Sequence, residues 1–205
     1  MAAVTAQRDD AVSTPASVSA GFGDPGPLGL AGFAATTFFL STVNAGLLPK
    51  TMEAGVFGLA FFYGGLAQLL AGMWEFVKGN TFGALAFASY GAFWMSFWYL
   101  ATHLPTGSAK DVGHAVGVYL LIWTIFTAYM LAASLRTSGA ITAVFLALTL
   151  TFLFLTVGAY AANDGMTKVG GWLGLLTAVL AWYASFAGVF NSTAKRAVVP
   201  TLPRA

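Results

Sequence analysis

Cysteine and charged residues are what this sequence has least of. Its 205 residues include nine Lys and Arg, seven Asp and Glu, and no cysteine. Only 8% of the residues are charged, against about 25% in soluble domains, so the chain cannot cover a water-facing surface with charge. A soluble enzyme is thereby excluded. Disulfides, thiolate metal sites and a cysteine nucleophile are excluded as well.

The few basic residues are scattered along the chain. The net charge is +2, and no Lys/Arg cluster could follow a phosphate backbone, so no nucleic-acid partner is expected. Apolar residues are what the chain does have, at 58% hydrophobic and 15% aromatic. We therefore expect membrane lipid, rather than water, around most of its surface.

Apolar stretches of about 20 residues, the length a helix needs to cross about 30 Å of hydrocarbon, follow one another along the chain. Runs such as residues 141–155 are apolar on every side, which favours helices over the alternating strands of a β-barrel. The expected fold is an all-α integral membrane protein with six transmembrane helices, at residues 27–47, 55–76, 81–99, 113–135, 140–162 and 171–190.

The expected organisation is a disordered cytoplasmic tail at residues 1–23, a membrane domain at 24–191 and a cytoplasmic C-terminal tail at 192–205. The first tail lacks the apolar core of a signal peptide. Six crossings put both termini on one side of the membrane. Because basic loops tend to stay in the cytoplasm, six of the nine basic residues predict cytoplasmic termini: Arg8, Lys78, Arg136, Lys195, Arg196 and Arg204.

A polar stripe runs along the first predicted span. Phe33, Thr37, Ser41 and Asn44 recur at helical spacing and share one face. In the second span, Gln68 stands in the middle of a face of small residues. Such side chains often only bond a neighbouring helix, for about 0.6–2 kcal/mol, or they line a pathway for a polar solute. Both interpretations stay open for any single residue.

Two acidic residues lie near the ends of predicted spans. Glu75 precedes Lys78 by three residues, a spacing that predicts an interfacial ion pair, with a titrating gate residue as the alternative. Asp24 precedes Pro25 and Pro27 at the start of the first span, where unpaired amides make the helix end positive. Asp24 either caps this helix or stands beside an anion site.

Several blocks resemble the acetate uptake transporter family of bacteria and fungi. The stretch DPGPLGLAGF at residues 24–33 is similar to the family signature NPAPLGL. The blocks FFYGGLAQLLAGMWEF at 61–76 and GNTFGALAFASYGAFW at 79–94 match as well, together with GVYLLIWTIFT and GWLGLL. The resemblance covers nearly all of residues 24–191.

This resemblance implies a six-helix protomer assembled as a homohexamer, each protomer with its own pathway, in the plasma (cell inner) membrane. The implied activity is uptake of acetate or a similar short carboxylate, succinate being a candidate, together with a proton. The family's hydrophobic constriction falls on Phe33, Tyr90 and Leu148. Signature residues implied to contact substrate are Pro25, Pro27, Leu28 and Gly29, and Gln68 matches the glutamine of the second block.

The chain departs from the family pattern in the signature and in the last span. Asp24 replaces the usual Asn and Gly26 replaces Ala, while Gly188 stands where the bacterial symporter has a glutamate. Asp24 would either repel anions or accept a proton. A proton role for the position of Gly188 does not transfer.

No Lys or Arg falls inside a predicted span, so binding is expected to depend on Thr37, Ser41, Asn44, Gln68 and Tyr90. A carboxylate that exchanges its hydration water for neutral hydrogen-bond donors alone pays a large desolvation cost. A proton that travels with the carboxylate lowers this cost. The alternative is a passive channel for a neutral solute such as urea, ammonia or undissociated acetic acid. No cofactor and no enzyme activity are expected, because the spans contain neither a nucleophile with a base nor a metal cluster.

Overall fold

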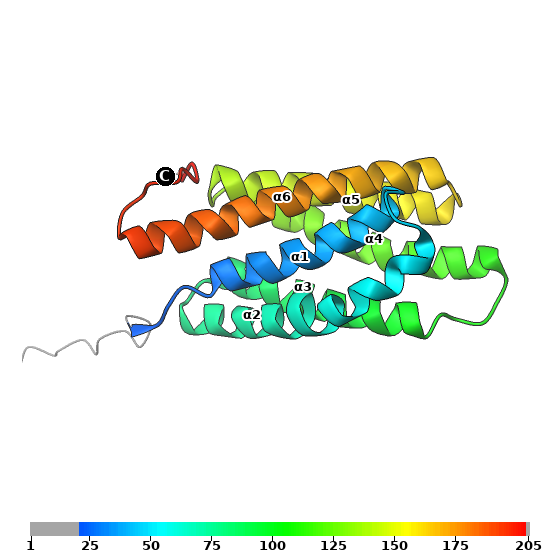
Figure 1. Ribbon diagram of the computed structural model, residues 1–205, viewed down its shortest axis with the longest axis horizontal. Coiled ribbons are helices and arrows are strands. Elements are labelled where there is room, and N and C mark those ends of the chain that lie inside the picture. The colour runs from blue at the N-terminus through cyan, green and yellow to red at the C-terminus, as the bar shows by residue number, and fades with distance from the viewer. Residues whose placement is uncertain (1–20, 204–205) are drawn as a thin grey trace, which may run out of the picture.

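The computed structural model describes residues 21–203 and is built of helices (Figure 1). Most of the predicted N-terminal tail and residues 204–205 lie outside this range. Within the range, the one pair of residues bridged as in a sheet is Ser138 with Pro203. The all-α prediction is confirmed. The helical elements are α1 (Gly26–Asn44), η2 (Lys50–Val56), η3 (Leu59–Ala67), α2 (Gln68–Val77), α3 (Thr81–Thr102), α4 (Ala109–Ser134), α5 (Gly139–Tyr160) and α6 (Asp164–Ala194).

Four of these helices, α1, α4, α5 and α6, are long and apolar enough to cross a membrane. The segment from η2 through α2 counts as a fifth if it is one broken span, bent by 42°. The helix α3 has 22 residues, but its Ser, Tyr and Trp side chains keep its hydropathy below that of a clear span. The structure therefore establishes an all-helical protein with four to five candidate spans.

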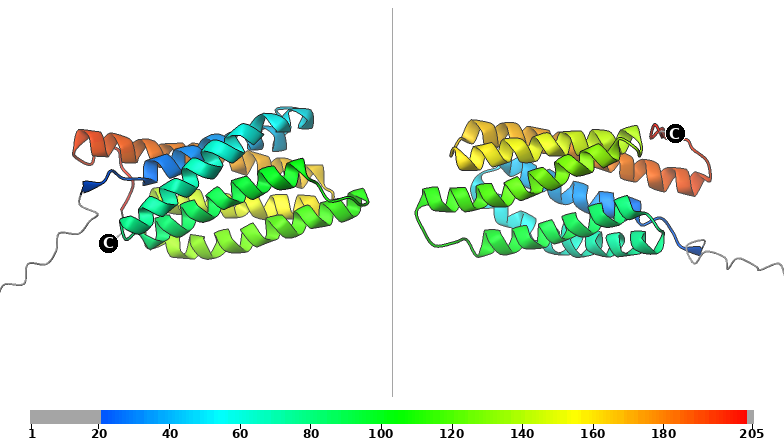
Figure 2. Two further views of the ribbon diagram at one scale, coloured as in Figure 1. Left: turned by 90° about the horizontal axis from the view of Figure 1, so that it is seen from below. Right: turned by 180° about the vertical axis from the view of Figure 1, so that it is seen from behind.

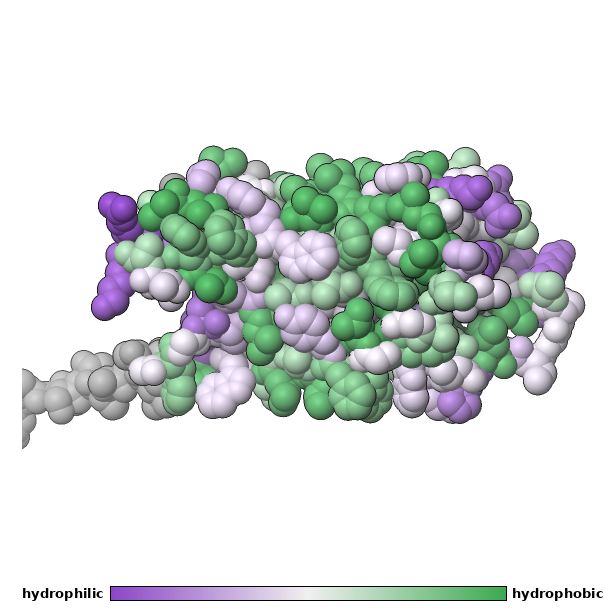
Figure 3. All heavy atoms as spheres, viewed as in Figure 1, coloured by the Kyte–Doolittle hydropathy of each residue, from purple (hydrophilic) through white to green (hydrophobic). Residues whose placement is uncertain are grey.

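Much of the surface of the bundle is apolar. On the face drawn in Figure 3, apolar residues fill the centre and hydrophilic residues gather toward the two ends. Large apolar side chains stay exposed on several helices, for example Phe62 (65%), Ile122 (58%) and Trp172 (56%). An exposed apolar area of this extent needs lipid or protein to cover it. Both ends of the described chain lie at the same end of this bundle (Figure 1).

The predicted second span, residues 55–76, is helical in the structure, but its helix is irregular. A 3₁₀ helix, η2, precedes the bend, and the following segment η3 is a π-helix. Glycines at 55, 58, 64 and 65 weaken α-helical geometry here. They also permit close packing, because a Cβ at Gly64 would lie 2.5 Å from Thr36 Oγ1 on α1. Figure 2 shows this irregular segment, in cyan, beside α1.

Helices α2 and α3 are in backbone contact, which gives a first prediction. A Cβ at Gly72 would overlap the backbone nitrogen of Ala88 and lie 2.9 Å from its Cα. We expect Gly72→Ala to destabilise the protein by about 1–3 kcal/mol, measured as a lower melting temperature in detergent. Gly58→Ala is the matched control, because nothing lies within 4 Å of a Cβ there. Equal melting temperatures for the two variants would contradict the close approach of α2 and α3.

Candidate functional site

A cavity of about 410 Å³ lies between α1, α2, α3, α5 and α6. It opens at the end of the bundle where α1 begins. Seven residues singled out in the sequence line it: Asp24, Pro27, Phe33, Gln68, Glu75, Tyr90 and Leu148. These side chains come from four different helices, so the fold brings them together from across the sequence.

The part of the cavity farthest from solvent is aromatic and apolar. Phe33, Tyr90 and Leu148 are each 3% exposed. The ring centroids of Phe33 and Tyr90 are 5.6 Å apart, and the Tyr90 hydroxyl bonds Thr127 Oγ1 on α4 at 2.9 Å. That hydroxyl is thus occupied by the protein, and the ring forms the wall. A solute passing here would have to move between rings and shed most of its water.

Gln68 supplies a polar atom to this apolar wall. The side chain is 1% exposed and lines the cavity. Its Oε1 atom has no hydrogen-bond partner among the described residues. A buried acceptor without a partner is costly, by about 1–3 kcal/mol, so this oxygen lacks the donor that its burial calls for.

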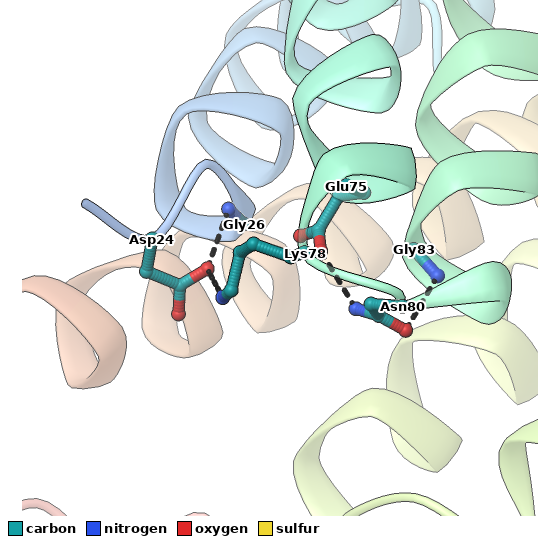
Figure 4. Close-up of polar contacts among 6 residues, drawn as sticks. All are labelled: Asp24, Gly26, Glu75, Lys78, Asn80 and Gly83. Atoms are coloured by element: carbon teal, nitrogen blue, oxygen red, sulfur yellow. Dashed lines mark hydrogen bonds and ion pairs between the residues drawn. The ribbon is translucent and has the colours of Figure 1, made fainter. Parts of the chain in front are cut away.

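The mouth of the cavity carries an ion pair between α1 and the end of α2 (Figure 4). Lys78 Nζ lies 2.9 Å from Asp24 Oδ1, and the Gly26 amide donates to the same oxygen at 3.0 Å. Asp24 therefore both holds the first amide of α1 and pairs with Lys78. The predicted pair between Glu75 and Lys78 is wrong, because Lys78 reaches across to α1 instead.

Glu75 is held by the turn that joins α2 to α3. Gly79 adopts a positive φ of 73°, and the Asn80 amide donates to the Glu75 carbonyl at 3.0 Å, a Schellman-type helix end. Asn80 then caps α3 by accepting from the Gly83 amide at 3.1 Å, and its Nδ2 donates to Glu75 Oε2 at 2.8 Å (Figure 4). Glu75 is 1% exposed, so a buried carboxyl faces the cavity.

Three residues of the signature lie outside the cavity lining. Leu28 is 45% exposed. A Cβ at Gly29 would lie 2.5 Å from the Phe87 ring, so this glycine lets α1 approach α3. Pro25 precedes the first turn of α1, and its carbonyl accepts from the Gly29 amide at 3.1 Å. These residues shape the start of α1, whereas Pro27 faces the cavity.

The polar stripe of α1 continues from this cavity toward the opposite end of the bundle. Thr37 and Ser41 are buried, at 5% and 4% exposure, and Thr37 Oγ1 has no partner among the described residues. Ser41 packs against Gly174 of α6. Asn44 lines a second cavity, of about 470 Å³, which also contains Lys50 and Lys168. The stripe thus joins two cavities about 16 Å apart along the helix, at 1.5 Å per residue.

Sequence reasoning missed several lining residues. Ile141, Val144 and Phe145 lie on the same face of α5 as Leu148 and line the first cavity with it, and their helical spacing could have indicated them. Lys78 was named only as a basic residue near the membrane surface and as a partner of Glu75, and not as a residue that lines the cavity. Lys78 lies just after α2 and outside the predicted span, so it adds a cation at the mouth and not within a span.

Long apolar helices around a cavity with a polar mouth are typical of one class of protein, the membrane channels and transporters. Within that class the chain belongs to the GPR1/FUN34/yaaH family, whose model matches residues 10–204. The family resemblance noted in the sequence is confirmed.

Relatives of this chain have been named for acetate. The chain is 43% identical over 195 residues to acetate permease A of Emericella nidulans, and the match covers 87% of this chain and 65% of the permease. It is 37% identical over 179 residues to the succinate-acetate/proton symporter SatP of Escherichia coli K12, covering 86% of this chain and 94% of SatP. The chain thus spans less than two thirds of the fungal permease.

A solved structure gives the same picture of the fold. The structure of the bacterial acetate channel SatP superimposes with a TM-score of 0.80 at 35% identity, covering 88% of this chain and 99% of that one. SatP is thus called both a symporter and a channel, so its names leave the mechanism open.

Proposed function

We propose that this protein takes up acetate or a similar short carboxylate across the plasma membrane together with a proton. The observation that carries the proposal is the cavity, which combines a charged mouth, a buried carboxyl and an aromatic closed end. A two-carbon acid is small enough for such a passage. SatP and acetate permease A, named for acetate, support the choice of solute.

In this proposal the solute moves along the stripe of α1. It enters the second cavity, moves past Asn44, Ser41 and Thr37 to Phe33, Tyr90 and Leu148, and leaves through the first cavity. Gln68 Oε1, which lacks a partner among the described residues, accepts a hydrogen bond from the acid. Neutral donors and acceptors alone compensate an anion poorly, so the proton travels with the carboxylate.

The assembly and topology belong to the same proposal. We propose that α3 crosses the membrane as the sixth span, that both termini face the cytoplasm, and that six protomers form a ring with one pathway each. The apolar side chains exposed on the outside of the bundle, such as Ile122 and Trp172, would contact either lipid or a neighbouring protomer.

Reconstitution into vesicles tests the function. We expect initial uptake of labelled acetate above that of protein-free vesicles, saturation with acetate concentration, and stimulation by an inward proton gradient. Uptake without any response to the gradient would contradict proton coupling. Uptake no faster than in protein-free vesicles would contradict acetate transport itself.

A passive channel for a neutral solute is the second candidate, favoured by the mostly apolar lining of the cavity and by the description of SatP as a channel. The passive channel and the proton-coupled carrier are distinguished by measuring the uptake rate at several pH values while total acetate is adjusted to hold the concentration of undissociated acetic acid constant. A channel for the neutral acid gives a constant, unsaturated rate. A carrier for anion plus proton gives a rate that changes with the concentration of the anion.

A further inference from the structure

We propose that Lys78 is the docking cation for the substrate carboxylate at the cavity mouth, and that Asp24 is a built-in competitor that occupies Lys78 until substrate displaces it. This inference rests on the proposed function, since it names the group that binds the anion at the end of the pathway that faces the cytoplasm in that proposal. The site is the mouth drawn in Figure 4, where α1 and the end of α2 meet.

Lys78 is the one cation among the lining residues that the structure describes for this cavity. Its side chain is 30% exposed, so it is reachable from water and still partly shielded from it. An ammonium group in this position binds a carboxylate as a point charge. An acid moving inward therefore reaches Lys78 after it has passed the aromatic rings, and an acid moving outward meets Lys78 first.

Asp24 presents to Lys78 the same chemical group that the substrate would present. Its carboxylate is 50% exposed, and Lys78 Nζ lies 2.9 Å from Oδ1. The Gly26 amide fixes the same oxygen at 3.0 Å. The Asp24 carboxylate therefore already accepts hydrogen bonds from Lys78 and from the Gly26 amide. A substrate carboxylate has to displace it in order to bind Lys78. An exposed ion pair is worth about 0.2–1 kcal/mol, which makes that exchange easy.

The pair also ties α1 to the α2–α3 turn across the opening. Lys78 caps the C-terminal end of α2 and is followed by the positive-φ Gly79, so the turn holds the base of its side chain. Glu75 Oε1 would lie 3.4 Å from a Cβ at Gly26, and Asp24 Oδ1 would lie 3.1 Å from it. The mouth thus carries two carboxylates, those of Asp24 and Glu75, and one ammonium group. A substrate anion that displaces Asp24 from Lys78 also lies near the carboxylate of Glu75, which accepts a hydrogen bond from Asn80.

Asp24→Asn is the central variant, because an asparagine oxygen still accepts from Gly26 while the charge is lost. We expect the KM for acetate efflux, measured from vesicles in which this mouth faces the lumen, to fall about two- to fivefold, the range that corresponds to one exposed ion pair. In the Lys78→Met background the same change is expected to leave KM unchanged. Lys110→Met, in the exposed first turn of α4, is the control for loss of a lysine charge and should not change KM.

An equal fall in KM in both backgrounds would overturn the proposal, because Asp24 would then act by repelling anions at a distance instead of by occupying Lys78. An unchanged KM in Asp24→Asn with Lys78 present would overturn it as well.

A binding measurement separates this inference from the proposed function. The native chain has no cysteine, so Asp24→Cys introduces a single thiol next to Lys78. We expect acetate, at constant ionic strength set with a bulky sulfonate, to slow labelling of this thiol by N-ethylmaleimide. In Asp24→Cys/Lys78→Met the rate should not respond to acetate. Labelling that ignores acetate while Lys78 is present would overturn docking on Lys78, whether or not the native protein transports acetate.

Discussion

Tyr90→Ala is expected to raise the initial uptake rate of butyrate about tenfold relative to acetate, because apolar pockets discriminate about 10–200-fold per methylene and the ring forms the wall. Tyr90 is buried among Phe33, Phe126 and Phe145, with ring centroids 5.2–6.2 Å away. Removing the ring leaves space that its neighbours fill only in part. The measurement is competition between labelled acetate and unlabelled longer acids in vesicles.

Two variants control this experiment. Tyr90→Phe keeps the ring and loses only the bond to Thr127 Oγ1, so the ratio of acids should stay native. Tyr129→Ala removes a ring that is 51% exposed on α4, and should leave selectivity unchanged. Native selectivity in Tyr90→Ala, with folding verified by its melting temperature in detergent, would remove this ring from the pathway.

Leu148→Ala should act in the same direction with a smaller effect. Leu148 faces the same cavity from α5 and is 3% exposed, but a leucine side chain occupies less of the cross-section than a tyrosine ring. We expect the uptake rate of butyrate relative to acetate to rise a few-fold, which is less than the rise of about tenfold expected for Tyr90→Ala. Leu146→Ala is the matched control, because Leu146 lies on the same helix and is 51% exposed. Equal gains in both variants would mean that general loosening of α5 is responsible.

The helices were predictable because their cause is local. Residues 139–160 are apolar at nearly every position and form α5 almost at the predicted bounds. The bend between η2 and η3 was not predictable by the same means, since the apolar run that begins at residue 55 continues through it. Close to this bend, Gly32 and Thr36 on α1 pack against Tyr63 and Gly64, a tertiary contact that a search for apolar periodicity does not contain.

The candidate site, like the fold, could be predicted from the sequence only in part. Helical spacing indicated that Thr37, Ser41 and Asn44 share a face, and the structure places Asn44 in a cavity at the far end. The partner of Lys78 was not predictable from spacing, because Glu75 is close in sequence whereas Asp24 is 54 residues away. Only the packing of α1 against α2 brings Asp24 and Lys78 together, and the Gly79 turn aims the lysine at the mouth.

Glu75→Gln is expected to remove most of the stimulation of uptake by an inward proton gradient. A carrier that binds one proton for each anion responds by up to about tenfold per pH unit, and Glu75 is the buried carboxyl that faces the cavity. Glutamine still accepts from Asn80 Nδ2, which donates to Glu75 Oε2 at 2.8 Å in the native protein. The turn is therefore preserved while the titrating group is lost.

The comparison variant is Glu53→Gln in η2, which precedes the bend in the segment that leads through α2. It removes an acid that does not line the cavity and should retain the native response to the gradient. Stimulation that survives in Glu75→Gln would mean that the proton enters on the acid itself, as undissociated acetic acid. In that case the buried carboxyl and Asn80 serve to hold the α2–α3 turn, and the aromatic end of the cavity alone selects the neutral molecule.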